Sequence, residues 1–376
     1  MKKVLLVGSI NDSHIYRFVT SLYQESKEFS IDFFDISVNK APALHAELFW
    51  KIYYIEKHFN SHLYKLPLLR NVLYLIDTKK SFEEIDKEYD IINFQYLTIH
   101  SFLFRNLLLK LQGKIVITPW GSDVYRANTL YRFCFRKIYD IADKVCAIRG
   151  SKFGDDVISL FHVPESKCVD LCFGSTVLDA VISNNTSREE AKERLFHSSD
   201  RYIITCGYNA SVAQNHIKII DAIKSVKNKQ PQKALWVFPM TYLKLKGYIE
   251  QIDCLLKEIG IDYVILDKFL SDEEMIYLRK STDVFIHMQV SDAYSSSLHE
   301  YLYSGAIVVN AEWLSYKELE TDCIPYILAN FDNLSEKLIE SFTHKPLQMT
   351  PSLREALTCY TWSYQIKQWV EFYRVL

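Results

Sequence analysis

The chain lacks several features that mark well-known classes of protein. Its net charge is only −2 over 376 residues, whereas proteins that bind nucleic acid in bulk carry a strongly basic surface. No apolar run reaches the length of a membrane span, and the first residues show no signal-peptide pattern. The eight cysteines form no Cys-x-x-Cys pair. These absences predict a cytoplasmic protein with reduced thiols that binds no nucleic acid.

The composition and rhythm of the chain indicate a two-domain α/β protein. With 376 residues, 49% of them hydrophobic, the chain is longer than a single core usually supports. Short apolar runs alternate with longer amphipathic segments, as in parallel sheets covered by helices. Residues 181–187 form a turn-rich junction, and Ser187 with Glu190 forms a capping box that opens a new helix. We therefore predict doubly wound domains at 1–182 and 183–359.

The apolar runs give two sets of expected strands. In the first domain they are Lys3–Val7, Ile31–Ile36, Ile91–Phe94, Ile115–Thr118, Lys144–Ile148 and Cys168–Phe173. In the second domain they are Tyr202–Cys206, Ala234–Phe238, Tyr263–Leu266, Val284–His287 and Ile307–Asn310. The aromatic C-terminal segment 360–376 has helical spacing. We expect it to cross back onto the first domain, with a plain terminal helix of the second domain as the alternative.

Residues 283–310 are the most informative segment. They read as a buried strand, a polar loop with Asp292, a serine-led helix carrying Glu300, a stop at Gly305 and a second strand. Such a unit places backbone N–H groups and a carboxylate where a strand gives way to a helix. α/β proteins bind phosphates and sugar nucleotides at this position. A dinucleotide-dependent oxidoreductase is disfavoured, because Gly8 is followed by Ser-Ile-Asn-Asp and not by a glycine triplet.

Over nearly its whole length the chain resembles the glycosyltransferases of the GT-B fold, especially the large retaining family that builds bacterial capsule, O-antigen and other surface glycans. The most specific match is Asp292, seven intervening residues and Glu300, followed by Tyr301-Leu-Tyr-Ser-Gly305. The family normally has glutamate where this chain has Asp292. The resemblance implies an α/β fold of two Rossmann-like doubly wound domains that face each other across a cleft.

Two further matches are local. Residues 117–123 are similar to the family's His-Gly-x-Asp region, but Trp120 replaces the histidine before Gly121 and Asp123. A second run resembles the transferases that add N-acetylated aminofucose to lipid-linked sugars, and it comprises Gly207, Asn209, Asn215, His216, Pro239 and Tyr242. The commoner Gly-Arg and Lys-Gly pair for the leaving diphosphate is missing. Its expected substitutes are His216, Lys244 and Lys246, in that order.

The resemblance implies a role for each matched residue. Transfer from a nucleotide sugar builds negative charge on the leaving diphosphate, so donors aimed at that oxygen lower the barrier. The expected catalytic residues are Asp292, Asp123 and His216. The expected donor-binding residues are Glu300, Ser295, Ser296, Ser297, Gly207, Asn209, Asn215, Tyr242, Lys244 and Lys246. Gly8, Ser9, His14, Trp120 and Gly121 are expected on the acceptor side.

Three of these roles are specific. Glu300 would accept hydrogen bonds from the ribose hydroxyls, and Asp292 would contact the transferred sugar or support its positive charge. The helix start at Ser295 to Ser297 would bind the diphosphate without a metal ion. Two aspartates flanking a single residue, the metal-holding motif of the other major transferase fold, occur nowhere in the sequence. We therefore predict that the protein needs neither a metal nor another cofactor.

Each candidate also has a purely structural interpretation. Glu300 would then be a solvated acid that favours the helix dipole. Asp292 would be a loop residue or cap, and Asp123 would cap the helix that begins near Val124. His216 would be a partly buried histidine, Asn215 a turn residue, and Gly8 a glycine that permits a tight turn.

Residues 45–80 are unusually rich in aromatic and long aliphatic side chains. They contain six Lys or Arg residues against three acids. This composition suits a helix lying at an anionic membrane surface, where a lipid-linked acceptor would be found. The alternative is packing inside the first domain or against a partner subunit.

The sequence as a whole predicts a glycosyltransferase. It would transfer a sugar, with retention, from a nucleotide-sugar donor to a glycan or lipid-linked acceptor in bacterial surface-polysaccharide synthesis, at the inner face of the cytoplasmic membrane. Two alternatives remain open. One is a sugar-nucleotide 2-epimerase of the same fold, and the other is a non-catalytic glycan-binding scaffold.

Overall fold

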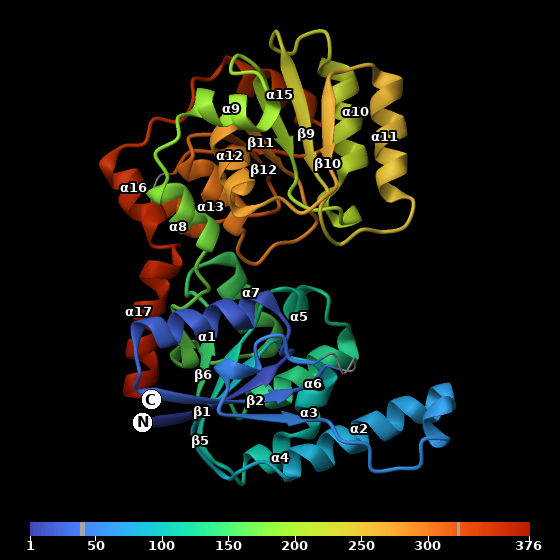
Figure 1. Cartoon of the computed structure of the whole chain (residues 1–376), viewed down its shortest axis with the longest axis vertical. Helices are drawn as coiled ribbons and strands as arrows, with labels where there is room; N and C mark the ends of the chain where they lie inside the picture. The colour runs from blue at the N-terminus through green and yellow to red at the C-terminus, as the bar shows by residue number, and fades with distance from the viewer. Residues whose placement is uncertain (38–41, 322–323) are drawn as a thin grey trace. The chain divides into compact units, whose positions relative to one another are not determined.

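A computed structural model of the chain describes residues 1–37, 42–321 and 324–376, which divide into two compact units (Figure 1). Unit 1 comprises Met1–Phe173 and Ser363–Leu376, and unit 2 comprises Gly174–Trp362. The predicted boundary after residue 182 lies inside unit 2. Helix α8 (Thr176–Ser183) belongs there because it packs on α12 (Asp272–Ser281) and α13 (Ser296–Tyr303).

Unit 1 is built on a seven-stranded parallel sheet in the order β3-β2-β1-β4-β5-β6-β7. Its central strands are almost continuously buried, as expected where helices cover both faces. The strands are β1 (Lys2–Gly8), β2 (Phe29–Asp35), β3 (Lys51–Tyr54), β4 (Glu88–Gln95), β5 (Gln112–Thr118), β6 (Lys144–Cys146) and β7 (Cys168–Val169). The helices are α1 (Ser13–Glu25), α2 (Pro67–Glu83), α3 (Ile99–Leu103), α4 (Arg105–Leu108), α5 (Ser122–Tyr125), α6 (Thr129–Tyr139), α7 (Lys152–Phe161) and α17 (Trp362–Val375).

The C-terminal helix α17 completes the core of unit 1 and lies beside α1 in Figure 1. The Trp369 ring packs edge-on against Phe18 of α1, with 5.0 Å between centroids. The buried Tyr373 hydroxyl accepts a 2.7 Å hydrogen bond from the Asn93 amide of β4. The aromatic side chains that mark this segment in the sequence are therefore core residues of the first sheet's domain.

Unit 2 contains a six-stranded parallel sheet in the order β10-β9-β8-β11-β12-β13. The strands are β8 (Tyr202–Cys206), β9 (Ala234–Pro239), β10 (Tyr263–Leu266), β11 (Val284–His287), β12 (Ile307–Ala311) and β13 (Ile327–Ala329). The remaining helices are α9 (Arg188–Phe196), α10 (His216–Val226), α11 (Tyr248–Ile259), α14 (Lys317–Thr321), α15 (Leu334–Thr343) and α16 (Pro351–Thr358). Both sheets have the order expected of doubly wound domains.

Every expected strand is present, and two strands were missed. Strand β3 lies inside the segment that was expected to be helical, so that part of the expectation is wrong. It pairs with β2 at the sheet edge and its side chains are exposed or half-buried, so it lacks the apolar run of a central strand. Strand β13 is only three residues long. Among the described helices, none combines the length and apolar character needed to cross a bilayer.

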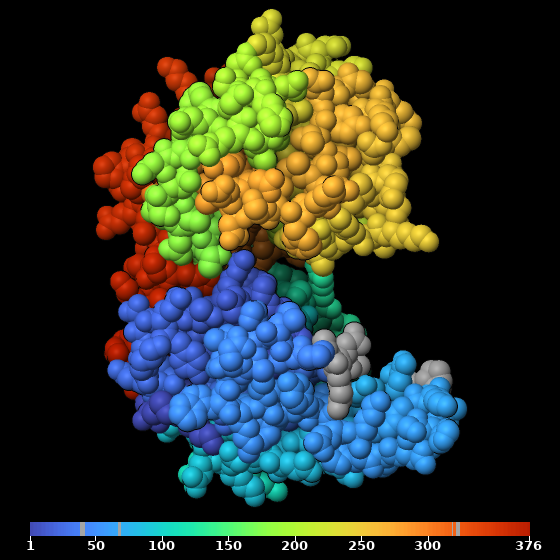
Figure 2. Space-filling view, viewed as in Figure 1, coloured from blue at the N-terminus to red at the C-terminus, as the bar shows by residue number. Residues whose placement is uncertain are grey.

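Around α2 the chain stands out from the rest of unit 1, as the light-blue arm in Figure 2 shows. Several large apolar side chains of the 45–80 segment are exposed, namely Leu63, Leu66, Val72 and Ile76 in or beside α2 and Trp50 directly before β3. Asp77, one of the segment's three acids, is fully buried and accepts a hydrogen bond from the Tyr64 hydroxyl. The exposed surface of this arm is therefore more basic than the sequence count suggests.

Candidate functional site

The predicted donor-binding residues of unit 2 follow the carboxyl ends of β8, β9 and β11. In a parallel sheet these ends share one edge, where α/β proteins bind ligands. The amide N–H of Gly207 donates to the Ile286 carbonyl at 3.0 Å, and the Ala210 N–H donates to the Tyr242 carbonyl at 2.8 Å. These bonds hold the loop after β8 against the ends of β11 and β9.

Gly207 allows a tight turn over the start of α10. Its φ is +66°, and a Cβ there would lie 2.8 Å from Gln214 Oε1 and 3.1 Å from His216 Nε2. A larger residue would therefore be strained and crowded. Asn215 has φ +59° and donates from its side chain to the Met288 carbonyl at 2.6 Å. Its structural role is to tie the turn to the loop after β11.

His216 lies beneath this turn and does not carry the charge expected of it. Its side chain is fully buried, with Nδ1 3.3 Å from the Tyr248 hydroxyl. Burial lowers the pKa of His216 to about 4. The imidazole is therefore neutral near pH 7, and its expected role as a cationic substitute at the diphosphate is corrected to that of a buried neutral side chain.

Because two histidines are buried, we expect the protein to lose stability in mild acid. Burial lowers the pKa of His216 and of His299 to about 4. Between pH 6.5 and 4 the unfolded chain then binds more protons than the folded chain, so the free energy of unfolding falls as the pH falls. We expect each histidine to contribute a loss of about 3 kcal/mol over this range. Urea unfolding of wild type, His216→Gln and His299→Gln at pH 7 and pH 4 measures it; an equal pH-dependent loss in all three proteins would contradict the prediction.

Tyr242 and Asn209 extend the site toward β9. Asn209 is buried and caps its own turn by accepting from the Ser211 N–H at 2.8 Å. Burial raises the pKa of the Tyr242 hydroxyl, and its hydrogen bond to the Asn209 side chain opposes this shift. Tyr242 is 40% exposed and is thus available to a ligand. Lys244 instead donates to the Asp267 carbonyl after β10, and Lys246 is exposed.

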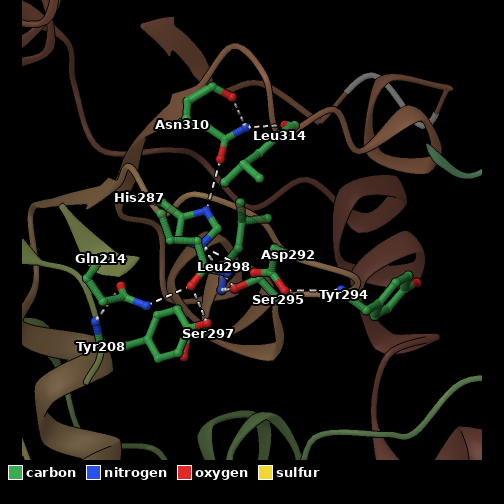
Figure 3. Close-up of polar contacts among 12 residues, drawn as sticks. Tyr208, Gln214, His287, Asp292, Tyr294, Ser295, Ser297, Leu298, Asn310 and Leu314 are labelled. Carbon is green, nitrogen blue, oxygen red and sulfur yellow. Dashed lines mark hydrogen bonds and ion pairs between the residues drawn. The ribbon is translucent and has the colours of Figure 1, made fainter. Parts of the chain in front are cut away.

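Asp292 lies in the loop between β11 and α13 (Figure 3). Its Oδ1 accepts from the Tyr294 N–H at 3.2 Å, and its Oδ2 accepts from the Tyr316 hydroxyl at 3.2 Å. The same Oδ2 lies 3.4 Å from Nε2 of His287, which is fully buried. The Asp292 side chain is 12% exposed. One face of this carboxylate therefore reaches the surface while the rest is held by the protein.

Helix α13 begins where the serine pattern predicted. Ser295 is its N-cap, and its hydroxyl accepts from the Leu298 N–H at 3.3 Å. Ser295 is buried, Ser296 is exposed and Ser297 is half-buried. The first N–H groups of a helix have no partner within the helix, and they carry the positive end of its dipole. An anion at Ser296 and Ser297 would meet these groups.

Glu300 is buried in an ion pair, which the sequence did not predict. Its Oε2 lies 2.7 Å from Nε of Arg279, and the two residues are 3% and 5% exposed. Its Oε1 accepts a 2.6 Å hydrogen bond from the Ser175 hydroxyl. The alternative of a solvated first-turn acid is therefore wrong. A ribose hydroxyl would have to share a carboxylate whose two oxygens already have protein partners.

In unit 1, the Asp123 carboxylate is buried and accepts hydrogen bonds from the backbone of two loops. One of its carboxylate oxygens accepts from the Leu97 N–H at 3.0 Å, and the other accepts from the N–H groups of Trp120 and Gly121 at 2.9 and 3.0 Å. Burial raises the pKa of Asp123 to about 6. The expected catalytic role is thus replaced by a structural one, because a 4%-exposed carboxylate with three backbone donors has no free face.

The expected acceptor-side residues meet at the carboxyl ends of β1 and β5. The His14 ring lies 5.2 Å from the Trp120 ring, whose indole N–H donates to Gln95 Oε1 at 3.3 Å. Gly8 permits close approach, since a Cβ there would lie 2.9 Å from the Gln95 carbonyl. Ser9 is exposed, and Gly121 has φ +98° beside Asp123. The structure therefore brings these residues to one edge of the first sheet.

Three functional candidates in unit 2 were missed: Arg279, His287 and Asn310. A signal for two of them was present in the sequence. His287 is the last residue of β11 and Asn310 the penultimate residue of β12, and they occupy partner positions in the β11–β12 register. Polar residues that close two buried apolar runs indicate a shared polar cluster at the sheet edge. Arg279 gave no such signal, because it lies within an ordinary charged helix.

Comparison with known proteins identifies the fold. No model of a known protein family matches the sequence, and no curated protein matches it. Among solved structures, 319 chains match. A glycosyltransferase from Rickettsia africae matches at 16% identity and TM-score 0.71, over 100% of this chain and 98% of its own.

Two other matches also extend over the whole chain. HepE of Anabaena in complex with UDP and glucose has 12% identity and TM-score 0.68, with 100% of both chains covered. Sucrose-phosphate synthase of Thermosynechococcus elongatus has 12% identity and TM-score 0.71, over 100% of this chain and 99% of its own. The chain therefore has the two-unit α/β fold of the GT-B glycosyltransferases, and that prediction is confirmed.

Proposed function

We propose that the protein is a glycosyltransferase that moves a sugar from a nucleotide-sugar donor to a glycan or lipid-linked acceptor. The observation that carries this proposal is the edge of the second sheet. There the partly exposed Asp292, the start of α13 and the Gly207 turn lie on neighbouring strand ends. HepE, which shares the fold, binds UDP and glucose. The same proposal assigns the protein to retaining transfer in bacterial surface-polysaccharide synthesis.

A thermal-shift screen tests donor binding. Specific binding to the folded state raises the apparent stability by mass action, by about 2.7 kcal/mol at a ligand concentration of 100 Kd. We expect one nucleotide among UDP, GDP and dTDP, and its sugars, to raise Tm clearly. If none does, the protein is better described as a glycan-binding scaffold. Donor consumed to an isomer with no acceptor present would instead identify a 2-epimerase.

We propose that transfer needs no metal ion. The start of α13 supplies backbone N–H groups for the diphosphate, and that role would otherwise fall to a cation. Turnover of the nucleotide sugar selected by the screen should be unchanged in EDTA. A loss that returns with Mg²⁺ or Mn²⁺ would contradict this part of the proposal.

We further propose that the arm of residues 45–80 contacts the anionic inner face of the cytoplasmic membrane, where a lipid-linked acceptor is held. Exposed Leu66 and Val72 flank the exposed Arg70 on this arm. Apolar and basic groups together bind anionic bilayer surfaces. We expect the protein to float with phosphatidylserine liposomes and the Leu66→Glu/Val72→Glu variant to stay in solution. Leu109→Glu, an equally exposed site of unit 1 outside the arm, is the control; wild type that remains entirely soluble would argue against contact.

A further inference from the structure

The last residue of β11, His287, lies between Asn310 of β12 and the loop that carries Asp292 (Figure 3). His287 is fully buried, so it does not itself face a ligand. Its Nδ1 lies 2.9 Å from Oδ1 of Asn310. Its Nε2 lies 3.4 Å from Oδ2 of Asp292 and 3.5 Å from Oγ of Ser295. The ring therefore links the rigid sheet on one side to the site loop on the other.

Asn310 determines which ring nitrogen carries the proton. Its Nδ2 donates to the carbonyls of Leu314 at 2.7 Å and Ala311 at 3.2 Å. The amide is therefore oriented with Oδ1 toward the ring, and an oxygen there only accepts a hydrogen bond. Nδ1 of His287 must then be protonated. This leaves Nε2 to interact with the loop, because the hydrogen bond made by one ring nitrogen sets the role of the other.

The ring is also fixed by packing. Its centroid lies 5.6 Å from that of Phe285 in a stacked arrangement and 6.0 Å and 6.2 Å from those of Tyr208 and Tyr316. A ring held in this way cannot rotate away from the loop without breaking aromatic contacts. The hydrogen bonds that Asp292 accepts from the Tyr294 N–H and the Tyr316 hydroxyl are both 3.2 Å long. The orientation of the carboxylate therefore depends on His287 as well as on these donors.

We infer that His287 is a positioning residue that acts on the reaction through Asp292. Its Nε2 faces Asp292 Oδ2 and Ser295 Oγ, and this contact fixes the loop and the orientation of the Asp292 carboxylate toward the donor sugar. The inference rests on the proposed function, because Asp292 matters to turnover only if sugar transfer occurs there. Misplaced catalytic groups lose rate even when binding is retained.

Two substitutions of His287 distinguish the contribution of Nδ1 from that of Nε2. His287→Asn keeps a donor near the Nδ1 position, and His287→Gln keeps an amide nitrogen near the Nε2 position. Both remove the ring, so both lose its packing. We expect His287→Asn to lower kcat about tenfold with the donor KM nearly unchanged, and His287→Gln to keep most of kcat. A purely structural histidine would give equal losses in both variants, in step with their Tm values.

A double-mutant cycle then tests whether His287 acts through Asp292. Turnover is followed as nucleotide released from UDP-glucose, GDP-mannose and dTDP-glucose. In an Asp292→Asn background, His287→Asn should change kcat less than about twofold, because residues acting as a unit are not additive. An equal factor in both backgrounds overturns the inference while leaving the proposed function standing. Release from none of the three donors by wild type overturns both.

A spectroscopic measurement tests the inference without the His287 variants, in case these fail to fold. In wild-type protein labelled with ¹⁵N-histidine, the His287 ring should show a proton on Nδ1 from pH 6 to 8. Asp292→Asn should shift the Nε2 resonance and leave Nδ1 unchanged. A neutral ring protonated only on Nε2, or no response to Asp292→Asn, would overturn the inference without reference to activity.

Discussion

Replacing Asp292 with Asn is expected to lower kcat about a hundredfold or more, comparable to the loss of a preorganised electrostatic contact in other enzymes. The sugar becomes cation-like as its bond to the diphosphate breaks, and the negative charge of Asp292 stabilises that state more than the ground state. Asn fits the same space and keeps an oxygen for the Tyr294 N–H. The donor's Kd should therefore change by no more than a few fold.

Single-turnover kinetics and a nucleotide-sugar titration measure the two effects separately. Glu250→Gln removes an equal charge from an exposed position on α11 and is the matched control. Control and wild type should have the same kcat. If Asp292→Asn turns over normally, Asp292 is a loop residue and has no part in transfer. If Kd weakens while kcat is unchanged, Asp292 binds the donor uniformly and does not discriminate the transition state.

The fold was predictable because the central strands are long apolar runs. Strands such as β1 and β11 are buried on both faces, so their burial is visible in the sequence as continuous hydrophobicity. Strand β3 was not predictable, because an edge strand in contact with solvent has no such run. The domain boundary was placed too late for a different reason. Helix α8 is short and polar at its end, and only its packing on α12 and α13 assigns it to unit 2.

The site was predictable only where local sequence determines local structure. The Ser295 cap and the Gly207 turn follow from the residue type at one position. The Leu97 partner of Asp123 and the Arg279 and Ser175 partners of Glu300 did not follow, because these partners lie 26, 21 and 125 residues away in the chain. Glu300 is thus buried by contacts with residues of other helices, which its own helix sequence does not reveal.

The burial of Glu300 changes what its substitution should do. If Glu300 only accepted hydrogen bonds from the ribose, Glu300→Ala would weaken nucleotide binding and leave the fold intact. The structure predicts a loss of stability as well, because the variant leaves the Arg279 guanidinium buried without its carboxylate. Breaking a buried ion pair in this way costs about 3–5 kcal/mol. Urea unfolding should show this loss, and unchanged stability would contradict the ion pair.

A ribose-binding role for Glu300 must therefore be tested in variants that lack the unpaired charge. Replacing both partners of a buried pair by groups of similar volume is often neutral for stability. The test compares Arg279→Met/Glu300→Leu with Arg279→Met/Glu300→Gln. Both variants lack Arg279, but only the glutamine side chain at position 300 can hydrogen-bond a ribose hydroxyl. The Leu variant should bind the nucleotide up to about tenfold more weakly than the Gln variant, the effect of one neutral hydrogen bond. Equal affinities at equal stability would make Glu300 a structural partner of Arg279 and Ser175, and would leave ribose recognition to other groups at this sheet edge.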